Sequence, residues 1–295
     1  MNYLSQKKGF LGYDANSKIK NKVVVVPFGL EKTVSYGTGT KNGPAEIIKA
    51  SHQVELFDEE LNKEPYKEIG FKTLRPIKIK KKIIHALNQL SQINHKIILN
   101  KKFPIVFGGE HSITAGSIKP FTKKYKEIVL LHFDAHADLR ENYNGEKYSH
   151  ASAIRRCLDF KNVKVISLGI RNISKTEMNF YKDNKNKIKI FWGKDKNKWN
   201  LKNLYSNLKG KNVYITFDVD ALDASIMPAT GTPEPGGLLW EEVLPIIKKV
   251  SQISKIIGAD INELAPIKNF DSYNFLVAKL AYKILAYIFE FKKKS

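Results

Sequence analysis

Cysteine is almost absent from this chain of 295 residues, since Cys157 is the only one. One thiol can form neither an internal disulfide nor a cysteine-based metal cage, and scarce cysteine is typical of proteins in a reducing cytoplasm. Any metal that the chain binds must therefore be held by His, Asp and Glu.

Long hydrophobic runs are also missing. The most apolar late stretch, Phe275–Phe289, is interrupted by Lys279 and Lys283, so it falls short of the ~20 apolar residues of a membrane-spanning helix. The first residues, MNYLSQKKGFLGYDAN, contain no apolar segment followed by a small-residue cleavage site. We expect a cytoplasmic protein with no membrane span and no secretory signal.

Arginine is scarce although the chain is strongly basic. Lys and Arg number 50 against 29 Asp and Glu, which gives a formal net charge of +21. Lysines are scattered over almost every segment, whereas arginine, the better bidentate partner of phosphate, occurs only at Arg75, Arg140, Arg155, Arg156 and Arg171. This dispersal favours a solvated, lysine-rich surface over a nucleic-acid interface.

No linker, internal repeat or low-complexity tract divides the chain, so we expect a single domain over residues 1–295. Seven apolar, β-branched runs are typical of strands buried on both faces: 23–27, 103–107, 128–133, 163–168, 188–192, 213–217 and 256–261. Helical spacing occurs between and after them, at 81–99, 197–208, 240–251 and 271–291. This alternation predicts an α/β fold with a mostly parallel sheet and helices on both faces.

Ligand-type side chains follow three of these strands. Asp134, His136 and Asp138 come directly after residues 128–133, at alternate positions that share one face in extended chain. Asp218 and Asp220 follow residues 213–217 in the same way, and His111 follows the strand at 103–107. In open α/β sheets, ligands bind beyond the carboxyl ends of the strands, so these side chains define a candidate site.

Four aspartates and two histidines are too many for one open metal site. Crowded carboxylates resist ionisation unless a cation lies among them. Oxygen ligands with two imidazoles and no thiolate favour a hard or borderline ion such as Mn²⁺, and the number of ligands suits two ions with bridging carboxylates. The alternative is that these residues only cap helices and turns or fill the interior.

Three long motifs resemble the signature blocks of the ureohydrolase family, which includes arginase and agmatinase. They are GGEHS at 108–112, FDAHADLR at 133–140 and FDVDALDASIMPATGTPEPGG at 217–237. SYGTGTKNGPAEI near the start and DINELAP near the end also match the family pattern. The resemblance implies a three-layer α/β/α fold with a mostly parallel sheet of about eight strands, and a homo-oligomer, either a trimer or a hexamer.

The resemblance also implies the ligands of two manganese ions per subunit. One ion would be bound by His111, Asp134, Asp138 and Asp218. The second would be bound by Asp134, His136, Asp218 and Asp220. Asp134 and Asp218 would therefore bridge the two ions.

Further roles are implied by position in the family pattern. His150 matches a histidine near the mouth of the site that shuttles protons, and Glu263 matches an acid that binds the guanidinium group. We expect Asp138 to share the proton transfer, and Thr232 to contact the substrate together with His150 and Glu263. The implied reaction is hydrolysis of a guanidino compound to urea and an amine.

The residues around these motifs favour agmatine as the substrate, with putrescine as the amine product. Arginases have an asparagine at the position of Arg140 and an acidic residue at the position of Ser174, and both contact the amino-acid end of arginine. The segments VELFDEEL at 54–61 and TPEPGG at 232–237 look like the agmatinase versions. L-Arginine is therefore disfavoured.

The sequence is also compatible with other substrates and with other functional classes. If the substrate tail is cationic, Arg140 must turn away from it or pair with Glu141 or Glu146. If Arg140 points inward, it would favour 4-guanidinobutanoate, which has a terminal carboxylate. Aminopropylagmatine is a further possible substrate. The alternatives from other functional classes are a nucleic-acid-binding protein and a metal-binding homologue that has lost catalysis and serves as a regulatory partner.

Overall fold

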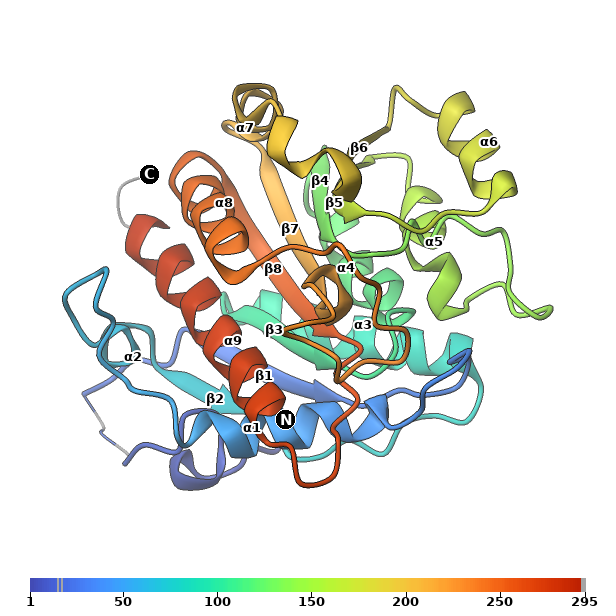
Figure 1. Ribbon diagram of the computed structural model, residues 1–295. Helices are drawn as coiled ribbons and strands as arrows, with labels where there is room; N and C mark the ends of the chain where they lie inside the picture. Colours follow the sequence, from blue (N-terminus) through green and yellow to red (C-terminus); the bar gives the residue numbers. More distant parts are fainter. Residues whose placement is uncertain (15, 17, 293–295) are drawn as a thin grey trace.

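The computed structural model describes residues 1–14, 16 and 18–292, so residues 15, 17 and 293–295 of the expected domain lie outside the described part (Figure 1). Within it, eight strands form one sheet in the order β2-β1-β3-β8-β7-β4-β5-β6, and every neighbouring pair is parallel. The strands are β1 (Val23–Phe28), β2 (Phe71–Thr73), β3 (Phe103–Gly108), β4 (Ile128–Phe133), β5 (Val163–Ile170), β6 (Ile188–Trp192), β7 (Asn212–Asp218) and β8 (Lys255–Asn262).

All seven predicted strands are present, and the prediction of a mostly parallel sheet is confirmed. The additional strand, β2, pairs with β1 at the edge of the sheet, where Val23 lies opposite Phe71. It has only three residues and a half-buried lysine in the middle, Lys72. A segment this short shows no periodicity that would distinguish it from a loop.

Nine α-helices flank the sheet in the described part of the chain. They are α1 (Gly43–Ser51), α2 (Pro65–Ile69), α3 (Ile83–Leu99), α4 (Ile113–Thr122), α5 (Ala153–Leu158), α6 (Lys175–Asp183), α7 (Leu201–Leu208), α8 (Trp240–Ile253) and α9 (Ser272–Phe291). The predicted helix at 197–208 begins later, at Leu201, because the Asn200 side chain accepts a hydrogen bond from the backbone of Asn203 and caps it there.

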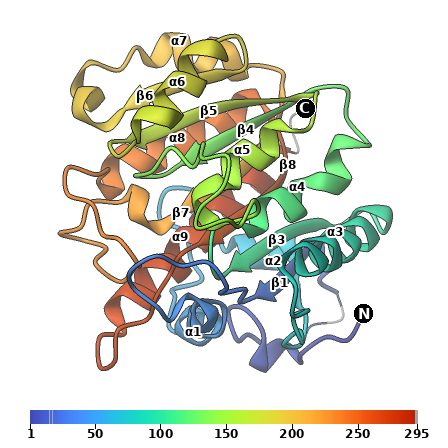
Figure 2. The same ribbon diagram turned by 90° about the vertical axis from the view of Figure 1, so that its right-hand side faces the viewer.

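The helices form a layer on each face of the sheet. Alternate residues of β1 divide between the layers: Val23 and Val25 join the core under α1, α8 and α9, whereas Val24 and Val26 join the core under α3. Figure 1 shows α9 crossing one face between α1 and α8, and Figure 2 shows α3, α4 and α5 in front of the other face. The result is a three-layer α/β/α arrangement.

The order of the strands in the sheet brings the candidate site residues together at its centre. β3, β8, β7 and β4 are consecutive neighbours, although they come from distant parts of the sequence. Because all strands are parallel, the segments that follow these four strands meet along one edge. This edge carries the motifs at 108–112, 133–140 and 217–237 together with Glu263.

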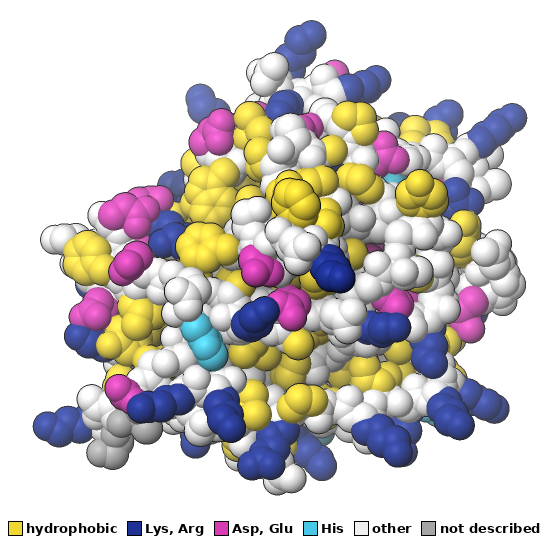
Figure 3. All heavy atoms as spheres, turned by 60° about the horizontal axis from the view of Figure 1, so that its bottom comes forward, with side chains coloured by type: hydrophobic (Ala, Val, Ile, Leu, Met, Phe, Trp, Pro, Cys, Tyr) yellow, Lys and Arg dark blue, Asp and Glu magenta, His cyan; other side chains and the backbone are white. Residues whose placement is uncertain are grey.

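The lysines that are scattered along the sequence are also dispersed over the surface of the protein. In Figure 3, Lys and Arg side chains are spread over the face shown, and Asp and Glu side chains lie among them. None of the helices in the described residues is long and apolar enough to cross a membrane.

Candidate active site

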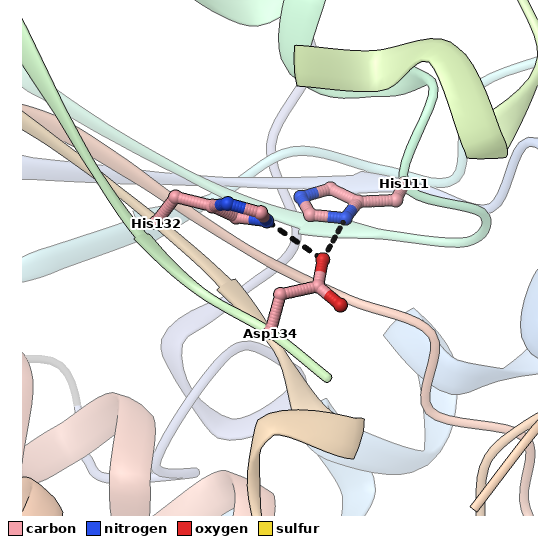
Figure 4. A group of neighbouring side chains, drawn as sticks. All are labelled: His111, His132 and Asp134. Carbon is pink, nitrogen blue, oxygen red and sulfur yellow. Dashed lines mark hydrogen bonds and ion pairs between the residues drawn. The ribbon is translucent and has the colours of Figure 1, made fainter. Parts of the chain in front are cut away.

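His111 and three aspartates converge where β3, β4 and β7 end. The Nδ1 atom of His111 lies 2.9 Å from Asp134 Oδ2, 3.1 Å from Asp138 Oδ2 and 3.3 Å from Asp218 Oδ2. All four side chains are nearly or fully buried. Figure 4 shows His111 and Asp134 pointing toward one another from different strand ends.

A second group of ligand atoms shares Asp134 with the first. His136 Nδ1 lies 2.9 Å from Asp220 Oδ2 and 3.7 Å from Asp134 Oδ1. The six residues predicted as metal ligands are therefore neighbours, and the two oxygens of Asp134 face the two halves of the cluster. A carboxylate placed in this way can bridge two ions.

Backbone hydrogen bonds hold these acids in place. Asp134 Oδ1 accepts from the amide of His136 at 2.6 Å, and Asp218 Oδ1 accepts from the amide of Asp220 at 2.9 Å. Asp220 Oδ1 in turn accepts from the amide of Ala135 at 3.0 Å, which ties the ends of β4 and β7 together. One oxygen of each of these three aspartates is thus fixed by a backbone amide.

The ionisation of these groups is strongly perturbed. Burial and the charge of Asp134 raise the pKa of Asp138 to about 6, and burial together with Asp220 raises the pKa of Asp218 well above its usual range. Burial opposes protonation of His136, but Asp220 and Asp134 outweigh it and raise its pKa to about 12. Crowded, buried carboxylates of this kind favour a cation among them.

The donor set fits divalent metal ions. His111 Nδ1 is buried and forms no hydrogen bond of acceptable geometry, although three carboxylate oxygens surround it. Its Nε2 atom lies 2.8 Å from Thr216 Oγ1, and that hydroxyl donates to Asp260 at 2.6 Å. With the ring proton on Nε2, the lone pair of Nδ1 faces the carboxylates, an arrangement that a cation would stabilise.

His132 also belongs to this cluster, and the sequence interpretation missed it. It lies inside β4, and its Nε2 atom is 2.7 Å from Asp134 Oδ2, while its Nδ1 atom is 2.9 Å from Ser167 Oγ (Figure 4). The signal was available, because residues 132, 134 and 136 alternate along one face. His132 therefore helps to orient Asp134, the acid shared by the two halves of the cluster.

Glu263 lies beside the cluster and is nearly buried. Its Oε1 atom accepts a hydrogen bond from the backbone amide of His111 at 2.7 Å. Burial raises the pKa of the Glu263 carboxyl well above its usual range. Glu263 has φ +65° and Asp138 has φ +52°, a left-handed conformation that is unusual for residues other than glycine and often occurs at functional sites.

His150 begins the 3₁₀-helix at His150–Ser152 and lines the same cleft. Burial and the nearby His136 and His111 lower the pKa of its imidazole to about 4. The ring is therefore neutral near pH 7, so it can accept a proton.

A cleft of about 220 Å³ leads from the cluster to the surface. Thr232, predicted to contact the substrate, lines it, and Glu234 lies two residues further along the same loop. The Glu234 carboxylate accepts a hydrogen bond from the Asn172 side chain at 2.5 Å, and its Oε1 atom lies 3.6 Å from His136 Nε2. No Lys or Arg of the described residues forms an ion pair with Glu234.

Arg140 lines this cleft, and it pairs with neither of the two nearby acids that the sequence offered as alternatives. The Nε atom of Arg140 lies 3.7 Å from Oε2 of Glu177, and its guanidinium lies over the ring of Tyr143 at 5.6 Å. Glu141 instead pairs with Arg155 and Arg156, and Glu146 accepts from the backbone of Tyr148. Arg140 is therefore matched by an acid within the cleft.

The buried Glu177 comes from the start of α6. It forms a capping box with Ser174: the Ser174 side chain accepts from the Glu177 amide, and the Glu177 carboxylate accepts from the Ser174 amide. Its other oxygen accepts from the amide of Leu139 at 2.9 Å, next to Arg140. The S-x-x-E spacing is a sequence signal for this cap, whereas its proximity to the cleft depends on the fold.

The acidic segment at 54–61 has a structural role. Asp58, Glu59 and Glu60 lie 3.1–3.4 Å from the ammonium group of Lys283, a buried residue of α9. These three carboxylates thus face α9 and do not line the cleft.

Comparisons with known proteins identify the family. The family model described as "Arginase family" matches residues 21–287. The chain belongs to the arginase family. It is a ureohydrolase, an enzyme that hydrolyses C–N bonds of amidines, and this family consists of binuclear metal enzymes.

Two relatives and one solved structure illustrate the similarity. A N(1)-aminopropylagmatine ureohydrolase from Synechocystis sp. is 33% identical over 99% of this chain and 98% of its own length. An agmatinase from Bacillus cereus is 34% identical over 84% of this chain and 85% of its own length. The agmatine ureohydrolase of Thermoplasma volcanium has a TM-score of 0.84 and 29% identity, covering 95% of this chain and 94% of its own. These names support activity on a guanidino group.

Proposed function

We propose that this ureohydrolase converts agmatine to putrescine and urea with two manganese ions per subunit. The observation that carries the proposal is the convergence of His111, Asp134 and Asp218 from three strand ends, beside the buried acid Glu263. The first three supply metal ligands, and Glu263 supplies a partner for a guanidinium group.

The candidate metal ligands are those brought together around Asp134: His111, Asp134, His136, Asp138, Asp218 and Asp220. Bound divalent ions would lower the pKa of water, which provides a nucleophile near neutral pH. In the overall reaction, the water oxygen forms a bond to the guanidinium carbon, and the bond from that carbon to the tail nitrogen breaks. The tail nitrogen takes up a proton, so the products are urea and an amine.

The protein side chains orient the substrate and move the proton. Glu263 would hold the guanidinium by a charged hydrogen bond, which fixes the carbon beside the metal cluster. The leaving amine requires a proton, which we assign to Asp138 or to His150. His150 lines the cleft and is neutral near pH 7, so it can exchange a proton with solvent. Thr232 would contact the substrate from the opposite loop.

The charge of the cleft supports a cationic tail. Arg140 and Glu177 face one another and largely cancel, because Nε and Oε2 are 3.7 Å apart. Among the described residues, His136 alone lies within ion-pair distance of Glu234, and a metal-bound histidine is neutral. Glu234 therefore remains as an acid that could attract the primary ammonium of agmatine.

Aminopropylagmatine is the second candidate substrate. The Synechocystis relative of that name matches 99% of this chain, a larger share than the 84% matched by the Bacillus cereus agmatinase. Its tail carries an additional amine, so the same acid in the cleft would attract it.

The first experiment is urea release by the manganese-loaded protein with agmatine, aminopropylagmatine, 4-guanidinobutanoate and L-arginine side by side. We expect agmatine to give the highest kcat/KM, and Asp134→Ala to abolish urea release and manganese binding. A preference for 4-guanidinobutanoate would contradict the agmatine assignment and make Arg140 the residue that binds the tail. Full activity without manganese would contradict the metal assignment.

The role of Glu234 is tested by Glu234→Gln, with Glu241→Gln on the exposed side of α8 as the matched control. Loss of a partly exposed charged contact should raise KM for agmatine about 3- to 10-fold. It should leave KM for 4-guanidinobutanoate unchanged or lower. Equal losses for both substrates would show that Glu234 does not recognise a cationic tail.

A further inference from the structure

The imidazole and the backbone amide of His150 both contact one hydroxyl group, that of Thr33. The backbone amide of His150 donates to Thr33 Oγ1 at 2.9 Å, and its ring nitrogen Nδ1 lies 3.1 Å from the same oxygen. The ring edge also meets Tyr143, with centroids 5.5 Å apart. The other ring nitrogen, Nε2, has no hydrogen-bond partner among the described residues. Thr33 therefore fixes both the backbone and the ring of this cleft histidine.

The Thr33 hydroxyl is oriented in turn by Glu110, whose side chain is fully buried. Thr33 Oγ1 donates to Glu110 Oε1 at 3.0 Å, and Ser112 Oγ donates to the same oxygen at 2.6 Å. Glu110 Oε2 accepts from the backbone amides of Lys32 and Thr33 at 2.5 and 2.7 Å. Four donors thus surround the carboxylate, and backbone amides can only donate.

With Glu110 ionised, a count of hydrogens determines the direction of each bond. A hydroxyl group has one hydrogen, and that of Thr33 is given to Glu110. Thr33 Oγ1 can therefore only accept from His150, so the ring proton must be on Nδ1. The neutral ring then has its lone pair on Nε2.

We infer that Thr33 and Glu110 are positioning residues, which hold His150 in the tautomer that presents Nε2 to the cleft as a free base. The inference rests on the proposed hydrolysis, in which His150 exchanges a proton. Thr33 is 117 residues from His150 and 77 from Glu110 along the chain. The three residues therefore join loops that only the fold brings together.

The most direct test is Glu110→Gln, which keeps the size of the side chain but reverses the two hydrogen bonds at the position of Oε1. The glutamine oxygen can accept from the two backbone amides, whereas its NH₂ group must donate to Thr33 Oγ1 and Ser112 Oγ. The Thr33 hydrogen would then be free to donate to Nδ1, which favours the opposite tautomer. We expect kcat for agmatine to fall about 10- to 100-fold, with KM, melting temperature and manganese stoichiometry almost unchanged.

Thr33→Val and Thr33→Ser provide the second test, because valine removes the hydroxyl and serine retains it. We expect kcat to fall in Thr33→Val and to recover in Thr33→Ser, while the remote control Thr122→Val on α4 has no effect. In a His150→Ala background, Thr33→Val should cause little further loss, because it acts through His150.

The possible failures are distinguishable. Wild-type kcat in Glu110→Gln, or an equal effect of Thr33→Val with and without His150, would overturn this inference and leave the proposed function intact. Absence of urea release by the wild-type, manganese-loaded protein with every guanidino compound would overturn the proposed function itself.

Discussion

Replacement of Glu263 by glutamine tests how the candidate site would bind a guanidinium group. The substitution keeps the length of the side chain and an oxygen that can accept from the His111 amide, as Oε1 does at 2.7 Å. It removes the negative charge, and it places an NH₂ group where the substrate also presents donors. Residue 263 keeps φ near +65°, which costs glutamine about as much as glutamate, so the fold should be preserved.

The size of the effect follows from the environment of the carboxylate. Glu263 is only 8% exposed, so a charged hydrogen bond there is weakly screened by water. Loss of one partner of such a bond costs about 2–4 kcal/mol, which corresponds to a roughly 30- to 1,000-fold lower kcat/KM for agmatine.

Steady-state urea release measures this effect, with manganese content determined on the same samples. We expect both metal ions to be retained, since Glu263 is not among the candidate ligands. Unchanged kinetics would refute the assignment of Glu263 as the guanidinium partner. Loss of manganese would instead show that the acid belongs to the metal cluster.

Three further predictions concern stability and are measured by urea unfolding. Lys283→Met should cost about 3–5 kcal/mol, because it leaves the buried Asp58 carboxylate without a cation; an unchanged midpoint would contradict this. Burial raises the pKa of Glu60, but Lys248 and other partners outweigh it and lower the pKa from 4.5 to about 2. The stabilisation that the ionised Glu60 provides should be present above about pH 4.5 and disappear as the pH falls toward 2. The Glu60→Gln variant should lack this pH-dependent part of the stability. Gly116→Ala should destabilise by about 1–3 kcal/mol despite the better helix propensity of alanine, because its Cβ would lie 2.6 Å from a backbone oxygen of α3; a stabilised variant would refute that packing.

The strands were predictable because parallel strands buried on both faces appear in the sequence as continuous apolar runs. Several helices were not, and α4 illustrates the reason. Eight of its ten residues are buried, so it has no polar face to produce a helical period. Helix α5 has only six residues, fewer than two turns. Amphipathic helices such as α3 and α8 were predicted, with their ends shifted by two residues at most.

The candidate ligands were predictable for a different reason. They follow strands at alternate positions, so the local pattern already places them on one face. The surrounding contacts carry no such signal. Thr33 and Glu110 lie in separate loops, and nothing in their spacing indicates that one hydroxyl joins them to His150. The sequence offered only nearby acids as possible partners of Arg140, whereas Glu177 is 37 residues away and reaches the cleft from α6.

The net charge of +21 is a poor guide to the substrate, and the geometry of the cleft explains why. Most lysines are exposed, and charges more than ~8 Å away are largely screened at physiological ionic strength. Within the cleft, Arg140 is matched by Glu177, while Glu234 and Glu263 face the space that a substrate would occupy. A basic protein can therefore present a locally acidic cleft. If this local balance decides, agmatine hydrolysis should respond to Glu234→Gln far more than to the loss of any exposed lysine.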